Sequence, residues 1–212
     1  MPYVMTIDQR GSRVHGDRVE PFLVQLATMV NDLRVQRADS SPSSLVRGFE
    51  RTVGDEVQAV LDDERLVVDL ALAVARDGGW SVGIGAGPVD LPLPESSRAG
   101  SGTAFVLART AVEAAKSRNR SVSLAVRGID DGAGRDAEAV LVLAAAAAAR
   151  RSTAGWEVVD AMTSSGARQE DVAEQLGVSQ QAVSQRLRAA LWAEEAAVHS
   201  AAARLLRLAA RV

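Results

Sequence analysis

The stretch QEDVAEQLGVSQQAVSQRLR, residues 169–188, predicts two short helices joined by a tight turn. Ala173 is small where the two helices would cross, and Gly177 suits the positive φ of such a turn. Ser179 can cap the second helix. The apolar residues recur at helical spacing on both sides of the glycine, so the two helices can share one core. That core would consist of Val172, Leu176, Val178, Val183 and Leu187.

The second of these helices would present a polar face without acids, since no aspartate or glutamate occurs between Ser179 and Ala193. Glutamine and serine can hydrogen-bond base edges, and arginine pairs with phosphate or guanine. The candidate DNA-binding residues are Ser179, Gln180, Gln181, Ser184, Gln185 and Arg188, with Arg186 as a further phosphate candidate. Residues 168–193 resemble the helix-turn-helix of bacterial regulators and of sigma-factor region four. Arg168 departs from that pattern, because Ser or Thr is common there, and an ordinary helical hairpin is the alternative.

Composition excludes several classes of protein. The chain has 212 residues, 47% hydrophobic and 24% charged, which is typical of a folded domain. It has no cysteine, so disulfides, thiolate catalysis and cysteine-ligated metal centres are excluded, and its two histidines lie far apart. Because the net charge is −3, the protein as a whole is not a polycation, and any nucleic acid would have to bind at a local basic patch. Neither a signal peptide nor a membrane span is evident, so we expect a cytoplasmic protein without membrane contact.

The chain changes character near residue 128. Strand and helix patterns alternate over residues 1–127, and the glycine- and aspartate-rich segment 128–134 predicts a linker. Almost all of residues 135–212 is predicted to be helical, beginning with helices at about 135–150 and 153–163. Residues 150–212 carry 8 arginines against 7 acids, so this half suits phosphate better than the first. Residues 190–211 are expected as one continuous helix, which would pair with a partner subunit or pack back onto its own domain.

The first half predicts the order β-α-β-β-α-β-α-β. The expected strands are 3–7, 45–53, 57–61, 80–89 and 121–126, and the expected helices are 17–35, 103–117 and one that Asp62 or Asp63 would cap and Gly78-Gly79 would end. This order contains the split β-α-β pattern of ferredoxin-like and palm-type domains. The fold class is therefore α+β, followed by an all-α domain. The glycines at 83, 85 and 87 would let a ligand approach the fourth strand.

Several short motifs in this half resemble the catalytic domain of class III nucleotide cyclases. Asp8 ends the first strand, Gly54-Asp55 lies at the tip of a hairpin, and Gly102 to Arg109 begins a helix. The resemblance implies that Asp8 and Asp55 bind metal, with Mg²⁺ or Mn²⁺ accompanying a nucleotide. The implied ligand-binding residues are Asp8, Gly11, Ser12, Gly54, Asp55, Glu56 and Arg109. Val106 stands where cyclases have an asparagine, and Arg109 comes one residue early, so we assign no catalytic residue and expect a degenerate domain.

Over nearly its whole length the chain resembles the SatD family of small bacterial proteins. The residues that carry the resemblance are Asp8, Gly11-Ser12-Arg13, Gly54-Asp55-Glu56, Gly83–Gly87, Phe105, Ala108-Arg109 and the helix-turn-helix. The leading hypothesis is a dimeric transcriptional regulator that binds double-stranded DNA, with residues 1–127 as a sensor of a nucleotide or other small ligand or as a dimerisation domain. The alternative is a metal-dependent nucleotidyl-transfer or cyclase-like enzyme that uses Asp8 and Asp55 and has a DNA-targeting tail. A third reading is an interaction protein whose helix-turn-helix contacts another protein.

Overall fold

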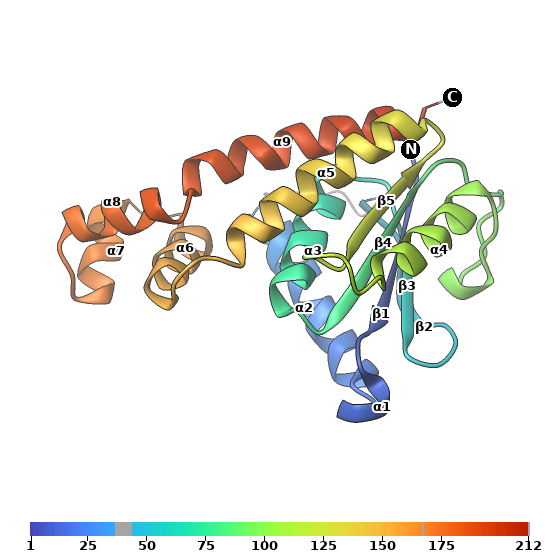
Figure 1. Cartoon of the computed structure of the whole chain (residues 1–212), viewed down its shortest axis with the longest axis horizontal. Coiled ribbons are helices and arrows are strands. Elements are labelled where there is room, and N and C mark those ends of the chain that lie inside the picture. Colours follow the sequence, from blue (N-terminus) through green and yellow to red (C-terminus); the bar gives the residue numbers. More distant parts are fainter. Residues whose placement is uncertain (37–43, 167, 212) are drawn as a thin grey trace.

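A five-stranded mixed sheet forms the centre of the α+β molecule (Figure 1). The computed structural model describes residues 1–36, 44–166 and 168–211. The strands are β1 (Tyr3–Gln9), β2 (Leu45–Arg51), β3 (Glu56–Leu61), β4 (Trp80–Ala86) and β5 (Leu124–Gly128), in the order β2-β3-β1-β4-β5. β1 is antiparallel to β3 and β4, β2 is antiparallel to β3, and β5 is parallel to β4.

Helices cover both faces of the sheet, which explains why β4 is buried at every position. Side chains alternate along β1, so Tyr3, Met5 and Ile7 pack beneath α2 (Val19–Gln36) and α3 (Glu64–Asp77). Val4 points to the other face, where it packs against α4 (Thr103–Ala115). Asp8 shares that second face by the same alternation and is the one residue of β1 that is not fully buried.

The glycines of β4 accommodate α4 and not a ligand, which corrects the expectation from sequence. A Cβ atom at Gly83 would lie 2.3 Å from the backbone nitrogen of Val112. A Cβ atom at Gly85 would lie 2.1 Å from the carbonyl oxygen of Ala104. Side chains at these two positions would therefore force the helix off the sheet.

The expected linker at 128–134 is replaced by the start of a long helix, α5 (Asp131–Ala148). Asp130 caps this helix by accepting a hydrogen bond from the backbone N–H of Ala133 at 2.9 Å. A Cβ atom at Gly134 would lie 2.9 Å from the backbone nitrogen of Gly128, so the glycine lets α5 approach β5 closely. Glycine and aspartate serve capping and close packing here, whereas the sequence pattern suggested a flexible turn.

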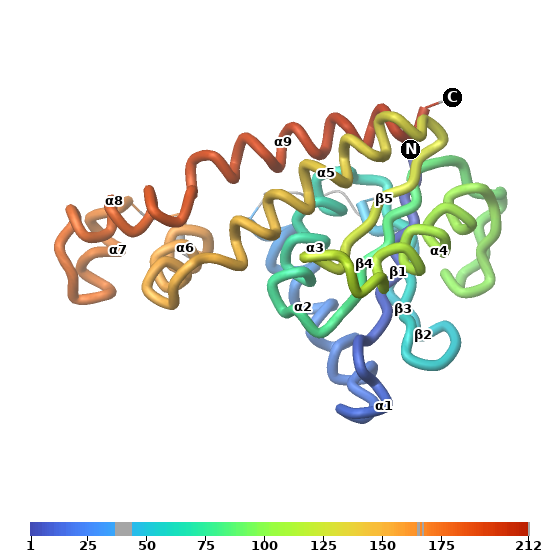
Figure 2. Tube along the Cα trace, in the orientation of Figure 1, coloured from blue at the N-terminus to red at the C-terminus, as the bar shows by residue number. Residues whose placement is uncertain are grey.

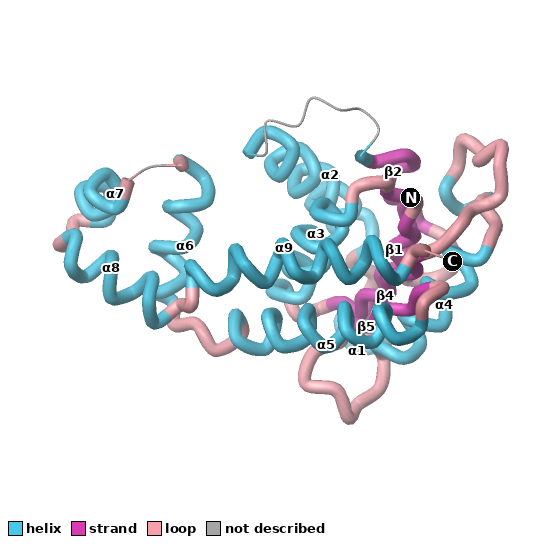
Figure 3. The backbone as a smooth tube through the Cα atoms, turned by 90° about the horizontal axis from the view of Figure 1, so that it is seen from above, coloured by secondary structure: helices cyan, strands magenta, loops and turns pink. Residues whose placement is uncertain are grey.

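The last helix, α9 (Trp192–Ala209), lies beside α5 and packs back onto the same chain (Figures 1 and 3). Ala202, Ala203 and Leu206 join the core of the sheet. The helix expected over 190–211 is present as α9, two residues shorter at each end, and Leu191, with a left-handed conformation of φ 55°, separates it from α8, which ends at Ala189. Within the chain, this helix thus packs on α5, α3 and the sheet, and not only within the helical domain expected over 135–212.

Three helices, α6 (Thr153–Ser165), α7 (Gln169–Leu176) and α8 (Gln180–Ala189), form a unit at one end of the molecule (Figure 2). They have a separate core. Its buried residues are Val158, Val159, Ala161, Val172, Ala173, Val183, Leu187 and Ala190. Packing therefore divides the chain differently from the expected boundary at residue 135, because α5 and most of α9 belong with the sheet. The unit of α6, α7 and α8 is called the three-helix unit below.

Two short helices, α1 (Ser12–His15) and the 3₁₀ turn η2 (Ser97–Ala99), were not expected from the sequence. None of the helices in the described part of the chain combines the length and apolarity needed to cross a membrane.

Candidate functional site

A cleft of about 560 Å³ opens between α4 and the face of the sheet that carries Asp8. Asp8 lies directly opposite Glu56 in the β1–β3 register, so two carboxylates occupy neighbouring strands at the same level. The other wall consists of α4 and the loop before it. The residues that line the cleft are Asp8, Thr52, Val53, Glu56, Gln58, Arg98, Gly100, Ser101, Gly102, Phe105, Val106, Arg109, Glu113 and Lys116.

Lys116, directly after the end of α4, neutralises the Asp8 carboxylate. Its Nζ atom lies 2.9 Å from Asp8 Oδ2 and 2.8 Å from Glu113 Oε1. Burial raises the pKa of Asp8 above its ordinary range, against the effect of Lys116, and the negative charges of Asp55 and Glu56 raise it further. Burial lowers the pKa of Lys116, but its two carboxylate partners outweigh burial and raise it overall. The cleft therefore holds a charged lysine against a carboxylate whose charge its surroundings disfavour.

The structure gathers only part of the predicted ligand-binding set. Asp8, Glu56 and Arg109 line the cleft, whereas Gly11, Ser12, Gly54 and Asp55 do not. Gly11, Gly54 and Asp55 belong to turns, and Ser12 is the first residue of α1. Gly54 has φ 69° in the β2–β3 turn, and the carbonyl of Asp55 accepts a hydrogen bond from the backbone N–H of Gln9 at 3.1 Å. Gly11 has φ 70° and precedes α1, which begins at Ser12.

Of the two predicted metal ligands, Asp8 lines the cleft, whereas Asp55 lies in the β2–β3 turn outside it. Asp8 already has a cationic partner, and a metal ion would have to displace the ammonium group of Lys116. Among the residues described, no group of three or more histidine, aspartate or glutamate side chains is arranged to hold a metal ion. Sequence reasoning missed Lys116, although it stands out as the only lysine in a chain with 24 basic residues.

The second candidate site is the α7–α8 segment of the three-helix unit. Gly177 adopts φ 64° and ψ 34° between the two helices. The Ser179 side chain then caps α8 by accepting a hydrogen bond from the N–H of Ala182 at 3.2 Å. Val172, Val183 and Leu187 are buried in the unit's core, with Leu176 and Val178 packed against them. The turn conformation, the cap and the shared core agree with the residue spacing.

Arg168 occupies the N-cap position directly before α7, where a Ser or Thr side chain is usual. The backbone N–H of Arg168 instead donates to Asp171 Oδ2 at 2.9 Å. Asp171 is the third residue of the helix, where a carboxylate can reach back to the backbone N–H of the N-cap residue. The departure from the usual pattern at Arg168 is thus partly compensated.

Gln181, Gln185 and Arg188 form the exposed stripe of α8, because their spacing puts them on one helix face. Gln180 is also exposed, with its Nε2 atom 3.5 Å from Glu170 Oε1. Ser179 is exposed but its side chain is engaged as the cap, and Ser184 is half-buried. Arg186 is half-buried beside α6, with its Nη1 atom 3.9 Å from Glu157 Oε2. The free stripe is therefore narrower than the set expected from sequence.

Comparisons of the chain with protein-family models, with curated proteins and with solved structures found no match. The functional argument accordingly depends on the residues and their geometry.

Proposed function

We propose that this protein is a DNA-binding transcriptional regulator that inserts α8 into the major groove. The observation that carries the proposal is the exposed stripe of Gln181, Gln185 and Arg188 on a capped helix that follows a glycine turn. α8 has 10 residues, and an α-helix with its side chains is about 10–12 Å across, which fits a major groove about 12 Å wide. The absence of acids from Ser179 to Ala193 keeps negative charge away from the phosphates. This function places the protein in the cytoplasm.

We further propose that the protein acts as a homodimer. A three-helix unit of this size offers few phosphate contacts, and two-fold symmetric dimers commonly add a second half-site. The two half-sites would be one helical turn of DNA apart, about 34 Å. Sedimentation of the protein with a duplex of selected sequence would measure whether two chains bind together.

The sheet-bearing part of the chain, which consists of β1–β5 and the helices packed on them, would serve as the sensor or dimerisation domain. Support for a ferredoxin-like, palm-type relationship comes from the strand order β2-β3-β1-β4, with β1 antiparallel to both neighbours and a helix after β1 and after β3. β5 extends this sheet through a parallel crossover by α4. A nucleotide in the Asp8 cleft would then be linked reciprocally to DNA affinity.

Selection of genomic DNA fragments by the purified protein tests the proposal. We expect a defined site whose affinity falls steeply with salt, because phosphate contacts release counterions. Gln181→Ala should cost about tenfold and relax base preference, since a good base contact discriminates by about 1–3 kcal/mol. Arg188→Ala should either lower the salt slope by about 1 or relax preference at a guanine.

Two variants provide matched controls. Gln175 is exposed on α7 and Arg204 is exposed on α9, so Gln175→Ala and Arg204→Ala remove the same groups outside the stripe. They should leave affinity within about twofold of the native protein, because surface changes elsewhere have small effects. Absence of any enriched fragment at low salt, or binding that is independent of salt, would contradict the proposal. Salt-independent binding would instead favour a protein partner.

The Asp8 cleft favours one second candidate, a metal-dependent nucleotidyl-transfer or cyclase-like activity that uses Asp8 with Glu56 in place of the expected Asp55. Its support is the pair of carboxylates at Asp8 and Glu56 beside a basic residue, Arg109. Incubation with each nucleoside triphosphate and Mg²⁺ or Mn²⁺ tests it. Turnover abolished by Asp8→Asn would support the activity, and no turnover in the native protein and in Lys116→Ala would oppose it.

A further inference from the structure

A cavity of about 850 Å³ separates the sheet-bearing part from the three-helix unit. α2, α3 and α5 contribute one side, and α6 and α9 contribute the other. Most of its wall is apolar, from Met29, Leu33, Leu72, Ala148, Val159 and Trp192. The volume lies in the range of small-molecule sites, which typically combine an apolar wall with a few placed polar groups.

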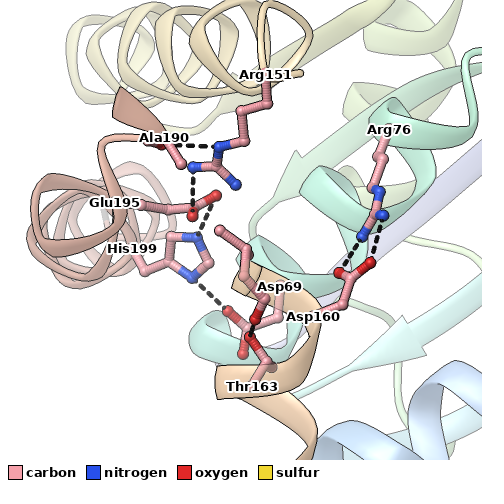
Figure 4. A network of polar contacts seen from close by, with 9 residues as sticks. Asp69, Arg76, Arg151, Asp160, Thr163, Ala190, Glu195 and His199 are labelled. Carbon is pink, nitrogen blue, oxygen red and sulfur yellow. Dashed lines mark hydrogen bonds and ion pairs between the residues drawn. The ribbon is translucent and has the colours of Figure 1, made fainter. Parts of the chain in front are cut away.

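Opposite charges face one another around this cavity (Figure 4). Arg76 of α3 donates two hydrogen bonds to Asp160 of α6, at 2.7 and 2.8 Å. Arg151, between α5 and α6, donates to Glu195 Oε2 at 2.6 Å. His199 Nδ1 lies 2.8 Å from Asp69 Oδ1.

These pairs disfavour a charged ligand. Burial lowers the pKa of His199, but the carboxylates of Asp69 and Glu195 outweigh burial and raise it to about 9, so the imidazole is charged at neutral pH. Each of the three cations therefore already has an acid partner, and a ligand with a net charge would have to separate one of the pairs. Asp77, exposed at the rim, adds a further negative charge that repels anions.

Two buried polar atoms in the wall lack a hydrogen-bond partner among the described residues, Arg151 Nη1 and His199 Nε2, and the second of these lies 3.9 Å from Glu195 Oε1. The Arg151 side chain is only 4% exposed, and its Nε atom donates to the carbonyl of Ala190 at 2.8 Å. Its Nη1 atom is buried and has no hydrogen-bond partner among the described residues. Buried donors are paired in the great majority of cases, so an unpaired guanidinium N–H marks a place for an acceptor. Figure 4 shows this third nitrogen apart from the bonds to Ala190 and Glu195.

Trp156 of α6 gives the cavity an aromatic surface next to that nitrogen. Arg151 lies over the ring at 4.6 Å from Cζ to the centroid, and Arg76 lies at 3.5 Å. Two guanidinium groups thus hold the ring in place. A ligand bound to Arg151 would lie beside a residue of the three-helix unit and beside the sheet-bearing part at once.

We propose that this cavity binds an uncharged, largely apolar small molecule that presents one hydrogen-bond acceptor, a carbonyl or hydroxyl oxygen, to Arg151 Nη1. The site is distinct from the Asp8 cleft, with which it shares no residue. Binding here does not depend on DNA binding, so the two proposals can fail separately.

The test uses the full chain and the dye 6-propionyl-2-dimethylaminonaphthalene, which is uncharged and has one ketone acceptor. Its emission moves to shorter wavelength in an apolar site. We expect saturable binding of one dye per chain. The matched anionic probe, 6-dimethylamino-2-naphthoate, should bind at least about tenfold more weakly because it must separate an ion pair.

Variants then locate the site. Ala148→Phe should weaken dye binding about tenfold or more, because the ring occupies cavity volume, whereas Ala147→Phe alters a neighbour that does not line the cavity. Thr163→Trp, with Ser164→Trp as its control, repeats the comparison on α6 if the first variant fails to fold. Arg151→Lys should weaken binding about fivefold, the usual loss for one hydrogen bond.

Equal binding by the filled and control variants would overturn the proposal. So would absence of saturable binding, or a naphthoate that binds as tightly as the ketone.

Discussion

The sheet-bearing part and the three-helix unit hold their cores together in different ways. The sheet core joins residues from both ends of the chain, such as Tyr3 of β1 and Leu206 of α9. The core of the three-helix unit draws its buried residues only from 158–190. Contacts between residues close in sequence cost little loop-closure entropy. We therefore expect the three-helix unit, the candidate DNA-contacting unit, to unfold or repack without disturbing the sheet. The sheet core, in contrast, requires both ends of the chain to be in place.

The largest expected effect would break the sheet side of this comparison. Gly85→Val should destabilise the protein by about 4 kcal/mol or more, because a Cβ atom there would lie 2.1 Å from the carbonyl oxygen of Ala104. Urea unfolding followed by circular dichroism measures the loss. Gly48→Val in β2 is the control, since a Cβ atom there meets nothing within 4 Å. Equal losses in both variants would show that α4 does not require the glycine.

A smaller effect should be confined to the three-helix unit. Leu187→Ala removes a buried side chain that is 5% exposed and should cost about 3 kcal/mol in that unit. Hydrogen exchange should accelerate in α6, α7 and α8, while β1 and β4 stay protected. Leu208→Ala, at a position 47% exposed, should change stability by no more than about 0.5 kcal/mol. Faster exchange throughout the sheet would mean that the two cores unfold as one.

Stability should depend on pH through His199, which lines the cavity between the two regions. The folded pKa of His199, about 9, exceeds the ordinary value of 6.5, so its contribution to stability is complete below pH 6.5 and is lost as pH rises through 9. We expect the free energy of unfolding to fall by about 1 kcal/mol, a small value because solvent screens the partly exposed His199 side chain. Urea unfolding at pH 6 and pH 9.5 should show it in the native protein and not in His199→Gln. The same slope in the variant would assign the effect to another group.

The smallest expected effect concerns Asp8. Ion-pair partners stabilise the charged form of His199, whereas burial destabilises the charged form of Asp8. Burial raises the pKa of Asp8, so the folded state disfavours its charge, and stability falls as pH rises from about 4 through the raised value. Relative to the native protein, Asp8→Asn should therefore have a more favourable free energy of unfolding at pH 7 than at pH 3. Lys116 keeps Glu113 as a partner in this variant. Destabilisation that is larger at pH 7 would show that the Lys116 pair outweighs burial.

Residue spacing was informative where structure depends on near neighbours. The turn at Gly177, the cap at Ser179 and the start of α3 after Asp63 each involve hydrogen bonds between residues a few positions apart. The same local reasoning failed over 128–134, where aspartate and glycine occur in caps and close contacts as well as in flexible turns. It also could not tell a ligand from α4 as the neighbour of the β4 glycines, because both require the missing side chain.

The sequence by itself determined the alternation of strands and helices over the first half, the α7–α8 turn and the acid-free face of α8. These features depend on periodicity and on conformational preferences of single residues. Tertiary structure alone decided that α9 returns to the sheet, that Lys116 pairs with Asp8, and that Arg151, Asp69 and His199 meet around one cavity. Asp69 and His199 are 130 positions apart, and no local pattern specifies which distant charges will meet. Packing of whole elements against a shared core brings them together.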